Sequence, residues 1–325
     1  MPKISILIPI YNVEQYIERC AISLFEQTLD DIEYIFVDDC TPDCSMELLE
    51  TVLARYPKRK NQVRIIKHHV NLGLSRTRQD AILAATGEYI AHCDSDDWMA
   101  PDAMEKAYAA ASKNNADICI FDFYASDGVN NRIVHVFPSA EVGSPEKFRE
   151  MIAKGEGLGY IWLKLYRRAI VDPERMVWPV AYMAEDYIIS IELAYFAKTA
   201  VYLNEPLYYY FDNPNSITMD HSVENIIRRS RGFAENTLTL ESFFRQQNVA
   251  ESYASAVYKL KFLSKHHLSR LVYSRKYYNM WRSCFPEVNL KSVLLSDFPP
   301  GIKIIYILVL LRIYPWLKNN FGNKR

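Results

Sequence analysis

Several signatures of common protein classes are missing from this 325-residue sequence. Its six cysteines include no CxxC pair, so reduced thiols of a cytosolic protein are the simplest interpretation. No signal peptide precedes the first apolar run, and the late apolar run 304–311 is too short to span a bilayer. The 38 basic and 39 acidic residues leave a net charge of −1, which argues against nucleic acid as a partner.

Three nucleotide and hydrolase motifs are also missing. A dinucleotide dehydrogenase needs GxGxxG after its first strand, where this chain has Pro9-Ile10-Tyr11-Asn12. There is no phosphate-binding P-loop and no GxSxG nucleophile motif, which excludes phosphate-loop NTPases and α/β-hydrolases. A nucleotidyltransferase would need a glycine-rich basic loop after the first strand, and that loop is absent. The remaining interpretation is a site that binds a nucleotide through side chains and a metal ion.

The apolar pattern that is present predicts an α/β fold. Half of the residues are apolar, and strand-like runs alternate five times with helical periodicity before residue 124. The predicted strands are 4–10, 33–37, 63–66, 89–93 and 118–123. A helix beginning at the N-cap Asn12 follows the first strand, and Gly87 is expected at the C′ position of a helix over 74–86. This alternation favours a mostly parallel sheet flanked by helices.

Polar clusters follow three of these strands. They are Tyr11-Asn12, Asp38-Asp39 and the run from Asp94 to Asp97. Ligands of open α/β sheets bind at the carboxyl ends of the strands, so the three clusters are expected on one edge.

The run Asp94-Ser95-Asp96-Asp97 crowds three carboxylates into four positions. Like charges at that spacing repel unless a cation or hydrogen-bond donors neutralise them. Hard oxygen ligands suit Mg²⁺ or Mn²⁺, which bind one or two carboxylates together with substrate phosphates. An aspartate-rich turn before a helix at Pro101 is the simpler alternative.

Taken together, the motifs resemble those of family 2 glycosyltransferases with the GT-A fold, a group that includes bacterial polysaccharide-type sugar transferases. The resemblance covers about residues 3–220 and rests on six stretches in order. They are Ile4 to Asn12, Val37-Asp38-Asp39, Asn71 to Ser75 with Arg78, Thr86 to Ile90, Asp94 to Trp98, and Glu185-Asp186.

The resemblance implies a donor site. Pro9, Tyr11 and Asn12 would line the nucleotide pocket, and Asp39, more than Asp38, would accept a hydrogen bond from a uracil N3–H. Arg78 would lie near the diphosphate, unless it is a surface helix charge. Asp94 and Ser95 would also contact the nucleotide.

It also implies a metal site and a base. Asp94, Asp96 and Asp97 would hold the divalent ion, Mn²⁺ or Mg²⁺, that bridges the two phosphates. Asp186, or Glu185 beside it, would take the proton from the acceptor hydroxyl. The alternative for this acidic pair is a helix N-terminus, where carboxylates favour the macrodipole. His92 lies in a buried strand and is expected to pack in the core.

The pattern changes near residue 220, which predicts a catalytic domain over 1–220 and a helical region over 221–325. Between Lys259 and Arg282 there are seven Lys or Arg residues and no acid. Basic residues beside an apolar, aromatic face suit an interfacial helix on an anionic membrane. The alternative is a helical subdomain with its charges in solvent.

The resulting hypothesis is an inverting, metal-dependent transfer of a sugar from a UDP-sugar to an acceptor hydroxyl. The acceptor is expected to be a saccharide or lipid-linked saccharide of cell-surface polysaccharide or glycolipid synthesis. The expected location is the cytoplasm, with peripheral contact to the inner face of the plasma membrane. The alternative is a catalytically degenerate protein that binds a nucleotide-sugar or a partner.

Overall fold

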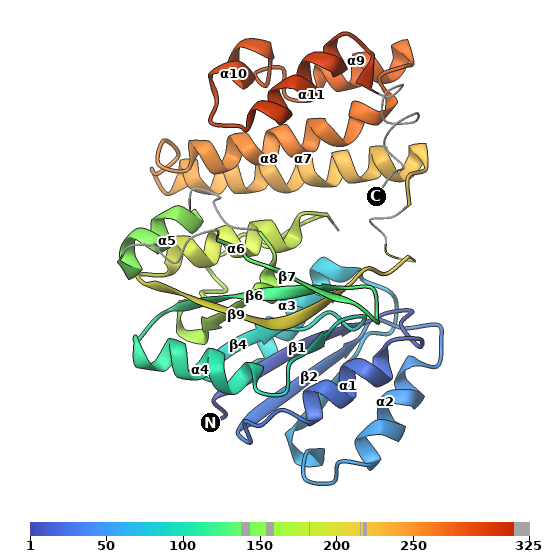
Figure 1. Cartoon of the computed structure of the whole chain (residues 1–325), viewed down its shortest axis with the longest axis vertical. Coiled ribbons are helices and arrows are strands. Elements are labelled where there is room, and N and C mark those ends of the chain that lie inside the picture. The colour runs from blue at the N-terminus through green and yellow to red at the C-terminus, as the bar shows by residue number, and fades with distance from the viewer. Residues whose placement is uncertain (138–143, 154–158, 182, 215, 217–219, 315–325) are drawn as a thin grey trace. The chain divides into compact units, whose positions relative to one another are not determined.

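The first strand of the sheet follows directly from its sequence. β1 (Ile4–Ile10) is an unbroken aliphatic run that is buried along its length except at Pro9, as a strand covered on both faces requires. The computed structural model in Figure 1 describes residues 1–137, 144–153, 159–181, 183–214, 216 and 220–314. The chain divides into two compact units, Met1–Pro214 and Asn215–Arg325.

The N-terminal half of the sheet is parallel, as predicted. β2 (Ile32–Asp38), β3 (Val63–Lys67) and β4 (Tyr89–His92) join β1 in the order β3-β2-β1-β4. In this register Ile10 lies beside Asp38, and Leu7 lies beside His92. The chain segments that follow β1, β2 and β4 therefore leave the sheet at one edge.

The second half of the sheet is mixed. Its strands are β5 (Trp98–Met99), β6 (Ile118–Ser126), β7 (Asn131–Val134), β8 (Lys164–Arg167) and β9 (Ala200–Phe211). β8 pairs antiparallel with both β4 and β6, and β6 pairs parallel with β9. The two-residue β5 pairs antiparallel with β9, which brings Trp98 beside Tyr209 directly after the aspartate run.

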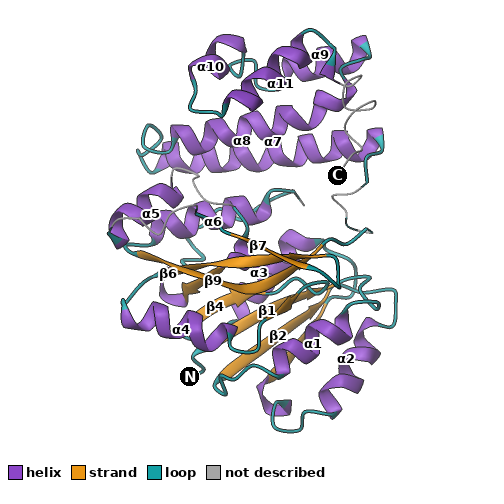
Figure 2. Ribbon diagram, in the orientation of Figure 1, coloured by secondary structure: helices purple, strands orange, loops and turns teal. Residues whose placement is uncertain are grey.

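Helices cover both faces of this sheet (Figure 2). They are α1 (Ile17–Phe25), α2 (Ser45–Ala54), α3 (Leu74–Ala84), α4 (Ala103–Lys113), α5 (Pro145–Ala153) and α6 (Glu185–Phe196). The apolar sides of α1, α2 and α4 share one core with Ile4, Ile6 and Ile8 of β1. α3 contacts β1 and β2 from the other face.

Two predicted helix ends are wrong. Asn12 is not an N-cap: α1 starts at Ile17, and Asn12 has φ +56° with its N–H donating to Thr41 Oγ1 at 2.8 Å. Gly87 is not a C′ residue, because α3 ends at Ala84 and its C-cap is Ala85. A glycine is needed at 87 for a different reason. A Cβ there would lie 2.6 Å from the Ser5 nitrogen and 2.8 Å from the Ile4 carbonyl carbon.

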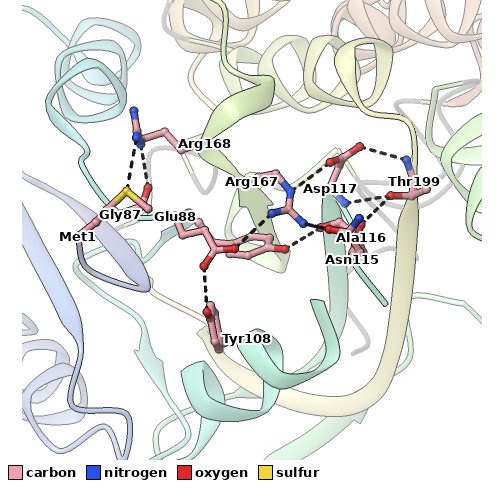
Figure 3. Close-up of polar contacts among 11 residues, drawn as sticks. Met1, Gly87, Glu88, Tyr108, Asn115, Ala116, Asp117, Arg167, Arg168 and Thr199 are labelled. Carbon is pink, nitrogen blue, oxygen red and sulfur yellow. Dashed lines mark hydrogen bonds and ion pairs between the residues drawn. The ribbon is translucent and has the colours of Figure 1, made fainter. Parts of the chain in front are cut away.

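A charged cluster joins the strands at the edge of the sheet away from the aspartates (Figure 3). The Arg167 guanidinium contacts Glu88 Oε1 at 3.2 Å and Asp117 Oδ1 at 3.3 Å. Asp117 Oδ2 in turn accepts the Thr199 N–H at 3.3 Å, just before β9. Glu88 also accepts the Tyr108 hydroxyl of α4 at 2.9 Å. This cluster ties the starts of β4, β6 and β9 to the end of β8.

The second unit is helical, as its periodicity predicts. Its helices are α7 (Val223–Gln246), α8 (Ala254–His267), α9 (Arg275–Ser283), α10 (Leu290–Leu295) and α11 (Pro300–Leu310). α7 and α8 run side by side, and Trp281, Phe262 and Tyr306 belong to the core that joins them to α9–α11 (Figure 1). Among the residues that the structure describes, no helix has both the length and the apolarity needed to cross a bilayer.

Replacing Gly87 tests the close approach of β1 to the loop before β4. We expect Gly87→Ala to lower the free energy of unfolding of the first unit by about 1–3 kcal/mol, because backbone atoms have no room to move. Urea unfolding followed by fluorescence measures this change. Gly301→Ala is the control, since its added methyl group meets no atom of the described residues within 4 Å. Equal unfolding midpoints for the two variants would contradict the prediction.

Candidate active site

The three polar clusters meet at the carboxyl edge of β1, β2 and β4, as the register requires. Pro9 is half-buried, while Tyr11, at 48% exposure, and Asn12 face solvent. The backbone N–H of Asn12 is bonded to Thr41, so the loop after β1 is tied to the loop after β2. The Tyr11 ring is therefore available to pack on a ligand at this edge.

The Asp39 carboxylate stabilises the loop that precedes α3. The residue is 3% exposed, and its carboxylate accepts the N–H groups of Leu72 at 2.8 Å and Gly73 at 2.9 Å. His68 Nδ1 adds a contact of 2.7 Å to the same carboxylate. Gly73 has φ +83°, a conformation that suits glycine, at the N-terminus of α3. The carboxylate thus fixes the path of the chain into α3.

Asp38 is more accessible than its neighbour. Its side chain is half-buried, and Oδ1 accepts the N–H of Thr41 at 2.9 Å. The other ring nitrogen of His68 contacts Asp80 Oδ2 at 3.2 Å, which Arg76 also contacts at 2.8 Å. Of the pair, Asp38 has more surface to offer a base, and Asp39 has more contacts within the protein.

Arg78 is the buried cation of the site. The side chain is 3% exposed, and Nη2 donates to Asp94 Oδ1 at 2.9 Å while Nε lies 3.6 Å from Glu185 Oε1. Burial alone would lower the pKa of Arg78, but Asp94, Glu185 and Asp186 outweigh it and raise that pKa. Nε and Nη1 are buried and have no hydrogen-bond partner in the part of the chain that the structure describes. The alternative of a surface helix charge is thus wrong for Arg78.

The three aspartates after β4 point to different partners. Asp94 has a side chain 26% exposed and faces Arg78, whereas Ser95 is buried at 5% exposure. Asp96 Oδ2 accepts the Asn213 amide at 2.8 Å. Burial and the charge of Asp94 raise the pKa of Asp96, against the opposing effect of that hydrogen bond.

Asp97 turns into the protein. Its exposure is 2%, and its two oxygens accept the Tyr208 hydroxyl at 2.8 Å and the Phe211 N–H at 2.7 Å. Burial, together with Asp96 and Asp94, raises the pKa of Asp97 well above its ordinary value. The Tyr208 hydroxyl also accepts the Asp94 N–H at 3.0 Å. Asp97 therefore anchors the aspartate run to β9.

The contacts of the three aspartates determine which of them can bind a divalent ion. Within the described residues, no group of three His, Cys, Asp or Glu side chains could hold a metal by itself. Asp97 has both oxygens engaged, so it does not fit as a ligand. Asp94 and Asp96 fit a Mg²⁺ or Mn²⁺ ion that draws its remaining ligands from water and substrate phosphates.

A contact chain orients Asp96 from two other elements. Tyr16, just before α1, donates its hydroxyl to Asn213 Oδ1 at 3.0 Å, and the Asn213 amide donates to Asp96. Arg19 of α1 donates to the Asp96 carbonyl at 2.9 Å, and its guanidinium stacks 3.8 Å from the Trp98 ring centre. The loop that carries Asp96 is therefore fixed by α1 and by the segment after β9.

Glu185 and Asp186 open α6 beside Arg78. Glu185 is 5% exposed, and burial with repulsion from Asp186 raises its pKa to about 8, against the opposing charge of Arg78. Asp186 is half-buried. Its pKa is raised by burial, which Arg78 and Lys164 partly oppose. Both acids thus occupy the helix N-terminus that the simpler alternative required, and both also lie in the field of Arg78.

Two polar residues of the neighbouring strands are buried, Lys164 on β8 and His92 on β4. Lys164 is 1% exposed and donates to the Tyr160 carbonyl at 2.5 Å. Burial lowers its pKa to about 7, although Asp186 opposes the shift. His92 is fully buried, as predicted, with Nε2 at 2.8 Å from the Tyr166 hydroxyl. Burial holds the pKa of His92 well below its ordinary value, so the ring is neutral.

Comparison with known proteins identifies the class of this site. The model of the family described as glycosyl transferase family 2 matches residues 5–172, more than half of the chain. The chain belongs to glycosyltransferase family 2. It is 31% identical over 260 residues to Bacillus subtilis EpsH, a protein named as a glycosyltransferase, covering 78% of this chain and 72% of EpsH.

Two further comparisons extend this result. The uncharacterized glycosyltransferase EpsJ of Bacillus subtilis is 36% identical over 225 residues, covering 67% of this chain and 63% of EpsJ. The crystal structure of S. aureus TarS 1–349 in complex with UDP-GlcNAc aligns with a TM-score of 0.66 and 18% identity. The alignment covers 98% of this chain and 91% of that chain. The predicted GT-A fold with C-terminal helices is thereby confirmed.

Several residues at the site of this glycosyltransferase carried no usable sequence signal. Tyr208, Asn213 and Arg19 contact the aspartate run from 77 to 117 positions away, and Tyr16 contacts Asn213. A lone tyrosine or asparagine in an aromatic strand end is ordinary, so only the pairing of β5 with β9 reveals their function. The burial of Lys164 near Asp186 also follows only from the fold.

Removing the Asp39 carboxylate tests whether it stabilises the loop before α3. Asp39→Ala leaves the N–H groups of Leu72 and Gly73 without their acceptor, at a cost of about 1–3 kcal/mol. We expect faster hydrogen exchange at those two amides, measured by NMR. Asp38→Ala is the control, since its carboxylate accepts only the Thr41 N–H among the hydrogen bonds described. Unchanged exchange at Leu72 and Gly73 in Asp39→Ala would show that the loop does not depend on the Asp39 carboxylate.

Proposed function

We propose that this family 2 glycosyltransferase transfers a sugar from a nucleoside-diphosphate sugar, a UDP-sugar, to an acceptor hydroxyl with inversion of configuration. The observation that carries the proposal is Arg78, which lies between the donor-side carboxylate Asp94 and the acidic pair at the start of α6. One buried cation thereby links the two carboxylate groups that such a reaction needs.

Donor binding is assigned to the edge formed by β1, β2 and β4. The exposed Tyr11 ring packs on the base or ribose, and Asp38 or Asp39 accepts the base N–H. The half-exposed Asp38 suits this contact better, because Asp39 already accepts three hydrogen bonds. The likeness to TarS, whose structure contains UDP-GlcNAc, supports a uridine nucleotide.

The diphosphate is assigned to Arg78, Asp94 and Asp96. Two buried guanidinium nitrogens of Arg78 have no hydrogen-bond partner among the described residues, and their N–H groups suit phosphate oxygens. Asp94 and Asp96 would hold Mn²⁺ or Mg²⁺. When bound, such an ion offsets the negative charge that develops on the leaving diphosphate. Asn213 holds the Asp96 carboxylate, and Arg19 holds the Asp96 carbonyl.

Asp186 is assigned as the general base. Burial and repulsion from Asp186 raise the pKa of Glu185, and Asp186 is the more accessible carboxylate of the pair, half-buried where Glu185 is buried. Asp186 removes the proton of the acceptor hydroxyl, whose oxygen attacks the anomeric carbon from the face opposite the diphosphate. The sugar–phosphate bond breaks as the new glycosidic bond forms.

The acceptor is a saccharide or lipid-linked saccharide in the synthesis of cell-surface polysaccharide or glycolipid. This assignment keeps the enzyme in the cytoplasm with peripheral contact to the inner face of the plasma membrane, where a lipid-linked acceptor is presented. The basic, aromatic composition of residues 259–282 in the second unit supports such contact.

Donor and metal binding can be measured without turnover. We expect UDP-sugar with Mn²⁺ to raise the melting temperature more than GDP- or dTDP-sugars do, because the bound form is stabilised by mass action. Asp96→Asn should weaken Mn²⁺ binding, read by electron paramagnetic resonance, by about tenfold or more. Asp97→Asn should lower the melting temperature and leave the Mn²⁺ stoichiometry unchanged. Loss of Mn²⁺ binding in Asp97→Asn alone would reverse the two assignments.

Replacement of the base tests the reaction itself. Asp186→Asn should lower turnover of UDP-sugar by about 10²–10⁴-fold and keep the affinity for UDP, because only proton transfer is lost. In the native enzyme kcat should rise with pH as Asp186 ionises, with a midpoint above the ordinary value of about 3.9. Product release assays over a pH series measure both. Near-native turnover in Asp186→Asn would reject the assignment.

A further inference from the structure

The net charge of −1 conceals a division between the two units. Residues 215–325 contain 17 Lys or Arg and seven Asp or Glu, a net charge of +10, so residues 1–214 carry −11. Acids are missing from two stretches of the second unit, 252–286 and 298–325. α9 and α11 lie within these stretches. A strongly basic helical unit attached to an acidic catalytic unit points to an anionic partner.

α11 presents an apolar face to solvent. Ile304, Ile307 and Leu311 recur at helical spacing and are 56%, 38% and 61% exposed. The opposite side of the helix, with Tyr306 and Val309, is buried in the core of the unit. Both sides of α11 are thus apolar, and only one of them has a protein partner in the part of the chain that the structure describes. A solvated helix carries polar residues on its outer face.

Basic and aromatic side chains adjoin the C-terminal end of this face. The Arg312 guanidinium donates to the carbonyls of Val272 at 2.9 Å and Tyr273 at 2.6 Å, so the segment before α9 lies beside the end of α11. Tyr273 is 60% exposed, and Arg275 and Lys276 after it are exposed. The resulting α11 surface comprises Tyr273, Arg275, Lys276, Ile304, Ile307 and Leu311.

We propose that the α11 surface docks the enzyme on an anionic lipid bilayer. Exposed isoleucine and leucine with a flanking tyrosine suit insertion at the headgroup boundary, and Arg275 and Lys276 suit the negative lipid surface. A nucleic acid would use the basic residues and leave the apolar face uncovered. A second copy of the chain would bring two basic units together, which repel each other. This inference names the surface for the membrane contact of the proposed function and rests on that function only for the acceptor.

Vesicle sedimentation of the full-length protein tests the surface directly. We expect the protein to co-sediment with vesicles of phosphatidylcholine mixed with phosphatidylglycerol and to stay in the supernatant with phosphatidylcholine alone. Added salt should release it, because exposed charges are screened. Arg275→Gln/Lys276→Gln and, separately, Ile304→Ser/Leu311→Ser should each lower the partition coefficient by about tenfold or more.

Two control variants alter the same residue types outside the surface. Leu238→Ser removes an apolar side chain of α7 that is 52% exposed, and Arg245→Gln removes a charge of α7 whose side chain is 69% exposed. Both should bind vesicles as the native protein does. Melting temperatures should be unchanged in all four variants, because the altered side chains are exposed. Hydrolysis of UDP-sugar in solution should also be unchanged, which separates failure of docking from failure of the proposed reaction.

Several results would overturn the docking proposal. They are equal sedimentation with both kinds of vesicle or with neither, native binding by both surface variants, and equal loss in the α7 controls. Concentration-dependent dimerisation that is lost in Ile304→Ser/Leu311→Ser, without vesicle binding, would instead assign the surface to a second copy. Salt-sensitive binding to an oligonucleotide in place of vesicles would assign it to nucleic acid.

Discussion

The buried guanidinium of Arg78 is the interaction on which the site depends. It lies 2.9 Å from Asp94 and 3.6 Å from Glu185, and it also acts on Asp186. Carboxylates buried this closely would repel one another and take up protons if the cation were missing. With Arg78 present, acidic groups from the end of β4 and the start of α6 can share one low-dielectric region. Two segments 91 positions apart, Asp94 and Glu185, become one site in this way.

The three aspartates of the run after β4 have different partners and therefore different functions. Asp94 accepts a hydrogen bond from Arg78, and Asp96 accepts one from Asn213. Both oxygens of Asp97 accept hydrogen bonds from β9, one from Tyr208 and one from Phe211. Each of the three carboxylates has its own hydrogen-bond donor, which offsets part of their mutual repulsion. The strand end is thereby fixed to β9 while two carboxylates stay available at the edge of the sheet. The same division applies to Asp38 and Asp39, of which one is accessible and one braces the loop before α3.

The two units differ in charge as well as in architecture. The first unit carries a net negative charge and holds the carboxylates around Arg78, whereas the basic second unit exposes an apolar helix face. A chain-wide net charge near zero therefore says little about partners when opposite charges are segregated along the chain. For this glycosyltransferase, the charge of each unit is the physically meaningful quantity.

By itself the sequence determined five of the strands (β1, β2, β3, β4 and β6), the parallel half of the sheet and the edge where the site lies. β1 is predicted residue for residue, because a strand covered on both faces requires an unbroken apolar run. The motifs around Asp94 and Glu185 also indicated the family, since they lie in order along the chain. Only the tertiary structure decided which acids are available and which are occupied. Asp97, Asp39 and Gly87 owe their functions to Tyr208, Leu72 and Ser5, partners that are distant in sequence and become neighbours only when strands pair.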